Sequence, residues 1–270
     1  MTIIYGTRGE PFLNMIKNII KRSGIKNDAL EKLMVSQRAL KMYESVFTHF
    51  SADQENNYEW LEILGDSTLN KCVVWYISKR FPQLKCSEGV KIIARLKINL
   101  ISKKTFADIA MRLDWWEFVT AEEEVKQTKK KKLLEDIFEA FFAATEILID
   151  EIVYPGSGYP ICYRIIATLF NELDISLEYE NLYDPITRLK EVFDYFKDIG
   201  TFAFENQKKD GHQHVQLYQV VHGLKVPIGW GIASLLDDAK QSACKRGLDN
   251  LKSRGIVKPI PEYYKTLTSK

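Results

Sequence analysis

The sequence has 270 residues and a mass of 31.3 kDa, which suits one large domain or two domains of ordinary size. Hydrophobic residues make up 46% of the chain and charged residues 27%, a composition that excludes a mainly disordered protein. The 38 Lys and Arg residues nearly balance the 36 Asp and Glu residues, which excludes a polybasic tail protein. Residues 181–270 hold 14 basic against 10 acidic side chains, so a second, mildly basic module suited to a polyanion is indicated.

The cysteines and the N-terminus indicate an intracellular protein. The 4 cysteines are widely spaced and form no Cys-x-x-Cys pair, so we expect neither a zinc site nor a disulfide framework. The first ten residues have no apolar signal core, and no uncharged apolar run approaches the ~18 residues of a membrane span. We therefore expect a cytoplasmic protein with no membrane partner.

Apolar residues recur at helical spacing through the first two thirds of the chain. The predicted helices cover residues 29–50 (one helix or two), 60–81, 89–113, 133–153 and 161–173. Pro82 ends the second of these, and the breakers between 155 and 160 end the fourth. No stretch alternates with period two for long, so this region is predicted to be all-helical.

The pattern changes after a short linker at 176–183. Asp184 is the predicted N-cap, and Pro185 a first-turn residue, of a helix that runs to about Lys197. Residues 201–206, 215–221 and 226–232 are rich in β-prone side chains, and 237–253 is helical again. The order helix, three strands, helix is typical of a small independent domain.

Acidic residues gather on two of the predicted helices. A helix turns ~100° per residue, so Glu59, Glu62 and Asp66 fall within an arc of ~60° on one face. Asp136 and Glu139 are three residues apart in a helix that is otherwise strongly apolar. Either cluster alone would be explained as a solvated face. Two such clusters among apolar neighbours favour a shared cation, since like charges repel and are costly to bury.

Carboxylate oxygens without His or Cys suit Mg²⁺ or Mn²⁺ better than zinc. Several carboxylates that face one another can hold two such ions about 3.5–4 Å apart, an arrangement that cleaves phosphodiesters.

The two acidic segments resemble the motifs of the ribonuclease III family. Residues 59–67 read Glu-Trp-Leu-Glu-Ile-Leu-Gly-Asp-Ser, close to the family signature Glu-Arg-Leu-Glu-Phe-Leu-Gly-Asp-Ser. Residues 132–140 resemble the second motif, Lys-x-x-x-Asp-x-x-Glu-Ala, and residues 48–51 match a preceding Thr-His-x-Ser. The chain departs from the pattern at Trp60, where Arg is usual, and at Tyr58, where Asn is usual.

The resemblance implies roles for the matching residues. The metal ligands would be Glu62, Asp66, Asp136 and Glu139. The catalytic residues would be Asp66, Glu139 and Lys132, of which Lys132 would lie near the scissile phosphate. Glu59 and Glu88 would be supporting acids, in an outer shell or at the dimer interface. It also implies Mg²⁺ as cofactor, with Mn²⁺ as a substitute, and a homodimer that cuts both strands of double-stranded RNA and leaves 5′-phosphate and 3′-hydroxyl ends.

The region after residue 183 resembles a double-stranded-RNA-binding domain. Matching positions for RNA contacts are Glu191 in the first helix, His214 in a Gly-x-x-His loop, and Lys240 in the last helix, with Lys245 a turn or two further on. Leu236 and Asp237 stand where the family usually has lysines, a change that weakens phosphate binding. The alternative is that this domain packs against protein instead of RNA.

The sequence therefore predicts an α+β protein: an N-terminal extension (1–28), an all-helical ribonuclease III domain (29–175), a small α-β-β-β-α domain (184–255) and a C-terminal tail (256–270). The predicted activity is Mg²⁺-dependent, double-strand-specific endoribonuclease. The alternatives are a ribonuclease III-like protein that no longer cuts and serves as a structural ribonucleoprotein component, and a factor that sequesters double-stranded RNA. Relatives that have stopped cutting typically lose metal ligands, whereas this chain keeps all of them.

Overall fold

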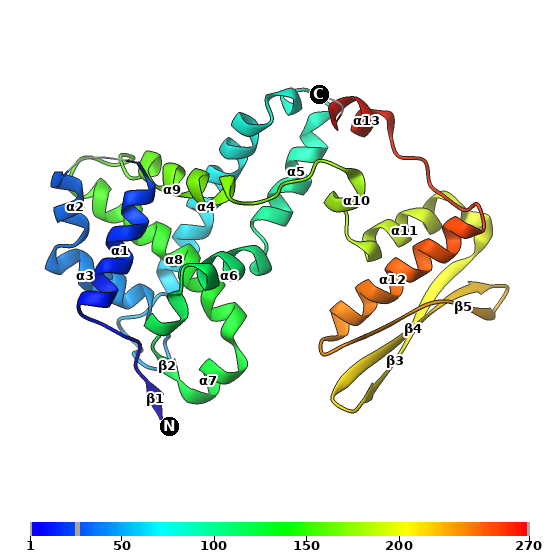
Figure 1. The fold of residues 1–270 in the computed structure, drawn as a ribbon, viewed down its shortest axis with the longest axis horizontal. Helices are drawn as coiled ribbons and strands as arrows, with labels where there is room; N and C mark the ends of the chain where they lie inside the picture. The colour runs from blue at the N-terminus through cyan, green and yellow to red at the C-terminus, as the bar shows by residue number, and fades with distance from the viewer. Residues whose placement is uncertain (1, 25–27, 269–270) are drawn as a thin grey trace. The chain divides into compact units, whose positions relative to one another are not determined.

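The structure is a computed structural model that describes residues 2–24 and 28–268. It divides into two compact units, Met1–Ile175 and Ser176–Lys270 (Figure 1). The first unit is helical and the second joins helices to one three-stranded sheet, so the predicted α+β class is confirmed. Among the described residues, no helix has the length and apolar character needed to cross a membrane.

In its described residues, the first unit consists of helices, two short 3₁₀ turns and one small strand pair. Its helices are α1 (Glu10–Arg22), α2 (Asp28–Met34), α3 (Gln37–Val46), α4 (Glu59–Arg80), α5 (Gly89–Leu100), α6 (Lys103–Arg112), α7 (Glu123–Thr128), α8 (Lys130–Asp150) and α9 (Tyr159–Asn171). The 3₁₀ turns are η1 (Pro82–Leu84) and η2 (Trp115–Phe118), and strand β1 (Ile3–Ile4) pairs antiparallel with β2 (Ala121–Glu122).

Some details of the first unit differ from the sequence prediction. The predicted helix 89–113 is divided into α5 and α6, because the Ser102 side chain accepts a hydrogen bond from the Thr105 N–H and so begins a new helix. The unit is also not purely helical, since β1 and β2 pair. The described part of segment 1–28 includes α1, whose apolar face is buried in the helical unit. This segment is therefore continuous with the core of the first unit.

Helix α8 lies at the centre of the first unit, with α4 packed along it. Its side chains from Leu133 to Thr145 are buried, and Phe138 and Phe141 join a cluster of aromatic rings with Trp115. Over this stretch every side of the helix is buried, as is typical of a helix in the core of a domain. Any acid on this helix is therefore held away from bulk water.

The second unit contains α10 (Tyr179–Leu182), α11 (Pro185–Tyr195), η3 (Lys197–Ile199), β3 (Thr201–Lys209), β4 (His212–Val221), β5 (Leu224–Ala233), α12 (Leu236–Ser253) and α13 (Glu262–Thr268). Asp184 caps α11 as predicted, since its Oδ1 accepts from the Thr187 N–H at 3.0 Å. The strands form one antiparallel sheet in the order β3-β4-β5. One face packs on α12, where Gly229 and Gly231 leave no room for a side chain against the helix.

Candidate active site

Helices α4 and α8 carry the acids of the two sequence motifs. Glu59, Glu62 and Asp66 lie on α4, and Asp136 and Glu139 lie on α8. The two helices meet at Gly65, which is buried and whose missing Cβ would collide with the main-chain carbonyl of Glu139. Asp66, the next residue on α4, is near enough for its charge to act on Glu139.

Glu139 lies within the negative field of the other acids. Its side chain is only 8% exposed. Burial raises the pKa of Glu139 to about 8, and the charges of Asp66, Glu135, Glu62 and Asp136 add to the shift. The structure thus brings the four predicted metal ligands into one electrostatic cluster.

Asp136 is the most deeply buried of these acids, at 2% exposure. Lys132 Nζ donates to its two carboxylate oxygens, at 3.0 Å to Oδ1 and 2.8 Å to Oδ2. The Tyr58 hydroxyl also donates to Oδ2, at 3.1 Å. Burial, and then the nearby charge of Asp136, raises the pKa of Tyr58, so its hydroxyl stays a donor. The predicted lysine therefore lies inside the acidic cluster, bound to a predicted metal ligand.

The remaining acids of α4 differ in burial. Glu62 is half-buried, and burial followed by the charge of Asp136 raises its pKa. Asp66 is exposed and accepts from the Asn70 side chain at 2.8 Å. Glu59 is exposed at the start of α4, and its charge acts on Glu62. Glu88 is exposed just before α5, and among the described residues no recorded hydrogen bond or ion pair joins it to the site on α4 and α8.

The donor chemistry of this cluster fits a divalent cation. All its candidate ligands are carboxylate oxygens, and the ammonium of Lys132 already occupies the place of a cation beside Asp136. Within residues 2–24 and 28–268, no three His, Cys, Asp or Glu side chains are grouped closely enough to hold a metal ion. The Asp136 carboxylate instead accepts from Lys132 and Tyr58, and that of Asp66 accepts from Asn70.

Two residues of the cluster were missed by the sequence analysis. Glu135 is buried on α8, and its Oε2 lies 3.4 Å from Lys103 Nζ. Its spacing of four residues from Glu139 placed it on the same helix face, a signal that was present in the sequence. Tyr58 precedes the signature and contacts Asp136 from 78 positions away, which no local pattern indicates.

In the second unit, the predicted RNA contact Glu191 is already bound within the protein. Its Oε2 accepts from the Tyr179 hydroxyl and from Lys258 Nζ, the latter at 2.6 Å. Tyr179 also packs its ring edge against Tyr264 of α13, which is buried. Residues on both sides of the small domain thus converge on Glu191.

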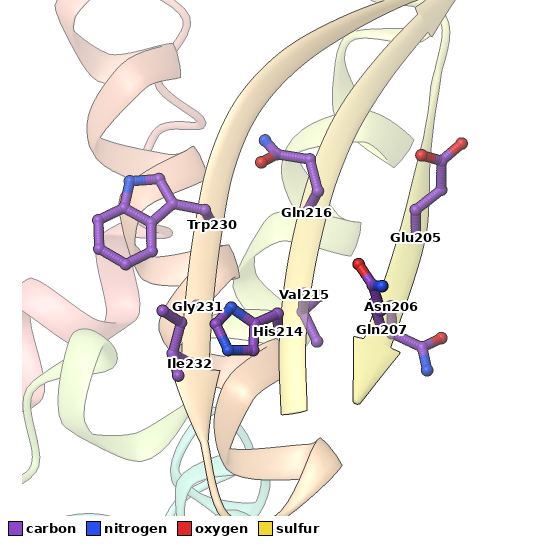
Figure 2. A pocket seen from close by; sticks show the side chains of 9 residues that line it. All are labelled: Glu205, Asn206, Gln207, His214, Val215, Gln216, Trp230, Gly231 and Ile232. Atoms are coloured by element: carbon purple, nitrogen blue, oxygen red, sulfur yellow. The ribbon is translucent and has the colours of Figure 1, made fainter. Parts of the chain in front are cut away.

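His214 lies on strand β4 and not in a loop, which corrects the sequence interpretation. Asp210 and Gly211 form the tight turn after β3, with φ of 50° and 77°, so β4 begins directly at His212. Gly231 and its partner Val215 face α12, so their neighbours Ile232 and His214 face the other side of the sheet. There His214 lines a shallow pocket with Gln216, Trp230 and Ile232 (Figure 2).

The predicted cations lie on α12, the helix that covers the opposite face of the sheet from His214. Lys240 is half-buried with its ammonium 5.5 Å from the centre of the Phe204 ring, and Lys245 is exposed. Arg246 stacks on Trp230, 3.6 Å from its ring centre. Asp237 and Asp238 are exposed in the first turn of the helix. His214 and Lys240 therefore lie on opposite sides of the sheet.

Comparisons with known proteins agree with the motifs. A family model of the ribonuclease III domain matches residues 59–147. A protein assigned as ribonuclease 3 in Invertebrate iridescent virus 6 is 38% identical, over 97% of this chain and 95% of that protein. A second from Frog virus 3 is also 38% identical over 79% of this chain, which spans 57% of that protein. The solved nuclease domain of Campylobacter jejuni ribonuclease III is 25% identical, with a TM-score of 0.44, and matches 55% of this chain and 99% of that domain. The chain belongs to the ribonuclease III family.

Proposed function

We propose that this protein is a Mg²⁺-dependent endoribonuclease that hydrolyses both strands of double-stranded RNA and leaves 5′-phosphate and 3′-hydroxyl ends. The observation that carries the proposal is the meeting of α4 and α8 at Gly65, where the charges of Glu62 and Asp66 on α4 act on a buried Glu139 with a raised pKa. A divalent cation stabilises such a concentration of negative charge, and perturbed acids of this kind are common at functional sites.

Each residue of the acidic cluster has a proposed role in the reaction. Glu62, Asp66, Asp136 and Glu139 would hold two Mg²⁺ ions, and Mn²⁺ would substitute for them. When bound, the ions supply an activated water and stabilise the leaving 3′-oxygen. Lys132 is exposed enough to leave Asp136 and bind the scissile phosphate, since its side chain is 54% accessible. The rival hypothesis, a relative that binds RNA without cutting it, has less support because all four acids are present and the charges of the other three act on Glu139.

The proposal includes a homodimer. Trp60, Ile63 and Leu64 are exposed apolar residues on α4, and their spacing places them along one strip of the helix. An exposed apolar strip of this kind is typical of a protein interface. Two paired copies would present two acid clusters to the two strands of a duplex.

We also propose that the second unit binds double-stranded RNA. Its helix, three strands and helix, with Lys240 and Lys245 on α12, support this role. We expect weak affinity, because Asp237 and Asp238 lie in the first turn of the same helix. For the face of the sheet that α12 does not cover, where Trp230 and Ile232 are exposed, binding of another protein is the favoured role.

The experiment is incubation of the purified protein with a long RNA duplex, with Mg²⁺ and with EDTA. The proposal expects short duplex products only with Mg²⁺. The products should carry 5′-phosphates, so that a polynucleotide kinase labels their 5′ ends only after a phosphatase has removed those phosphates. Single-stranded RNA of the same sequence should stay intact. A Glu139→Gln variant is the matched control, since it keeps the size of the side chain and removes its charge. Equal cleavage by the variant, or cleavage in EDTA, would contradict the proposal.

A further inference from the structure

Tyr58 joins the two acid-bearing helices through a side-chain hydrogen bond. It directly precedes α4, and its hydroxyl donates to Oδ2 of Asp136 on α8. None of the proposed roles in the acidic cluster includes this residue. The contact falls on the carboxylate that is most buried among the proposed metal ligands.

The Tyr58 side chain is held rigidly. Its ring is 1% exposed and lies edge-on to His49. Its main-chain N–H donates to the Thr48 carbonyl at 3.2 Å, and its own carbonyl accepts from the Glu62 N–H at 2.9 Å. A residue fixed at the ring and on both sides of its main chain holds its hydroxyl at one point, so it also fixes the orientation of the carboxylate to which it donates.

Lys132, the second partner of Asp136, is less constrained. Its half-exposed side chain reaches the carboxylate from one turn earlier on the same helix. Within the described residues, Oδ1 accepts from Lys132 alone, whereas Oδ2 is shared between Lys132 and Tyr58. When the ammonium moves away, Oδ1 is the oxygen that becomes available to another cation, while Oδ2 stays on the Tyr58 hydroxyl.

We propose that Tyr58 is a positioning residue of the active site, which anchors Oδ2 of Asp136 and so presents Oδ1 to a divalent cation. This inference rests on the proposed function, because it assigns Asp136 to metal binding. Groups that hydrogen-bond to a metal ligand orient it, and their loss typically weakens metal affinity about 10–100-fold.

The test compares two buried tyrosines in the full-length protein. Tyr58→Phe removes the hydroxyl that binds Asp136. Tyr43→Phe is the matched control, since the Tyr43 side chain is equally buried. Its hydroxyl forms a hydrogen bond of 2.9 Å with Thr145 Oγ1 in the core, and not with the acids. Mg²⁺ affinity is measured by titration calorimetry, and stability by thermal unfolding in EDTA. We expect both variants to lose similar stability, and only Tyr58→Phe to bind Mg²⁺ about 10-fold more weakly or worse.

Two further measurements keep the outcomes distinct. In the Asp136→Asn background, Tyr58→Phe should add no further loss of Mg²⁺ affinity, because Tyr58 acts through Asp136. In wild-type protein with ¹³C-labelled tyrosine, Mg²⁺ should shift the ring signal of Tyr58 but not that of Tyr43. Equal Mg²⁺ affinity in wild type and Tyr58→Phe, or an unmoved Tyr58 signal, overturns the positioning role while the proposed function stands. A wild-type protein that binds no Mg²⁺ overturns both.

Discussion

Gly65 of α4 lies directly against the main-chain carbonyl of Glu139 in α8, with no space for a side chain between them. This contact sets the distance between the helices that carry the two acid pairs. A glycine here is required by the close approach of the two backbones, since the residue lies within a regular helix and needs no unusual φ.

Gly65→Ala should therefore separate α4 from α8 and abolish cleavage. The added methyl group meets backbone atoms of Glu139, which cannot rotate away, so an overpacking cost of about 1–3 kcal/mol or more is expected. Ser78→Ala on the same helix is the control and should leave both stability and cleavage nearly unchanged. The measurements are thermal unfolding and duplex cleavage. Full cleavage by Gly65→Ala would show that the helix spacing does not matter.

The second prediction concerns the pH dependence of stability. The unfolded Glu139 loses its proton near its ordinary pKa of 4.5, while the folded one keeps it to about pH 8. Between these values the folded state binds more protons than the unfolded state, so the free energy of unfolding should fall as pH rises. Glu139→Gln removes this titration and should stabilise the metal-free protein at pH 8 but not at pH 4.

Thermal unfolding in EDTA from pH 4 to pH 9 measures this difference. The gap between variant and wild type should widen between about pH 4.5 and pH 8 and then stay level. Mg²⁺ at pH 8 should raise the unfolding temperature of the wild type more than that of Glu139→Gln. A gap independent of pH would mean that Glu139 is not held protonated.

Local patterns predicted the parts of this molecule that local chemistry decides. The Asp184 cap and the span of α4 depend on neighbouring residues, so the sequence indicates them directly. The spacing of Glu62 and Asp66 also placed them on one helix face. Which helix faces another is decided by packing, and here the family motifs, not periodicity, joined the acids of α4 to those of α8.

The contacts that sequence analysis missed link positions far apart in the chain. Tyr58 meets Asp136 across 78 positions, and Glu191 meets Lys258 across 67. His214 was misplaced for a different reason. The dipeptide Asp210-Gly211 between two β-prone runs is a strong hairpin signal, and it extends the strands into the region interpreted as a loop.

Lys132→Gln should affect metal binding and cleavage in opposite directions. The ammonium at 2.8 Å from Asp136 competes with any cation for that carboxylate, so its removal should tighten Mg²⁺ binding. Because the lysine is half-exposed, the gain should be modest, up to about fivefold for an ion pair worth about 1 kcal/mol. Cleavage should slow, since the phosphate contact is lost.

Lys131→Gln is the control for this prediction, because it removes the same charge from the adjacent, exposed position. Titration calorimetry gives the Mg²⁺ affinity and a duplex substrate gives the rate. Weaker Mg²⁺ binding by Lys132→Gln would mean that the lysine supports the metal site and does not compete with the ion.

The exposed apolar strip of α4, formed by Trp60, Ile63 and Leu64, leads to a prediction about assembly. Ile63 is 74% exposed and Trp60 is 58% exposed, so Ile63→Asp should cost little in the isolated chain but place a charge in a dimer interface. We expect light scattering at micromolar concentration to show a dimer for the wild type and a monomer for the variant. Ile152→Asp, at an exposed apolar position outside α4, should remain dimeric. A monomeric wild type would remove the dimer from the proposed function.

The last prediction separates the two faces of the second unit. Lys240 and Lys245 lie on α12, whereas His214 lies on the face of the sheet turned away from that helix. If duplex RNA binds along α12, Lys240→Ala and Lys245→Ala should each weaken binding and lower the slope of log affinity against log salt by roughly one unit. His214→Ala should change both quantities less than either lysine variant, because His214 lies on the face of the sheet turned away from α12. Each variant is made in the full-length Glu139→Gln protein, so that binding is measured without cleavage, and titrated over a range of salt.

A large effect of His214→Ala with none from the lysines would place the RNA on the sheet. No effect from any of the three would leave protein binding as the better account of this unit.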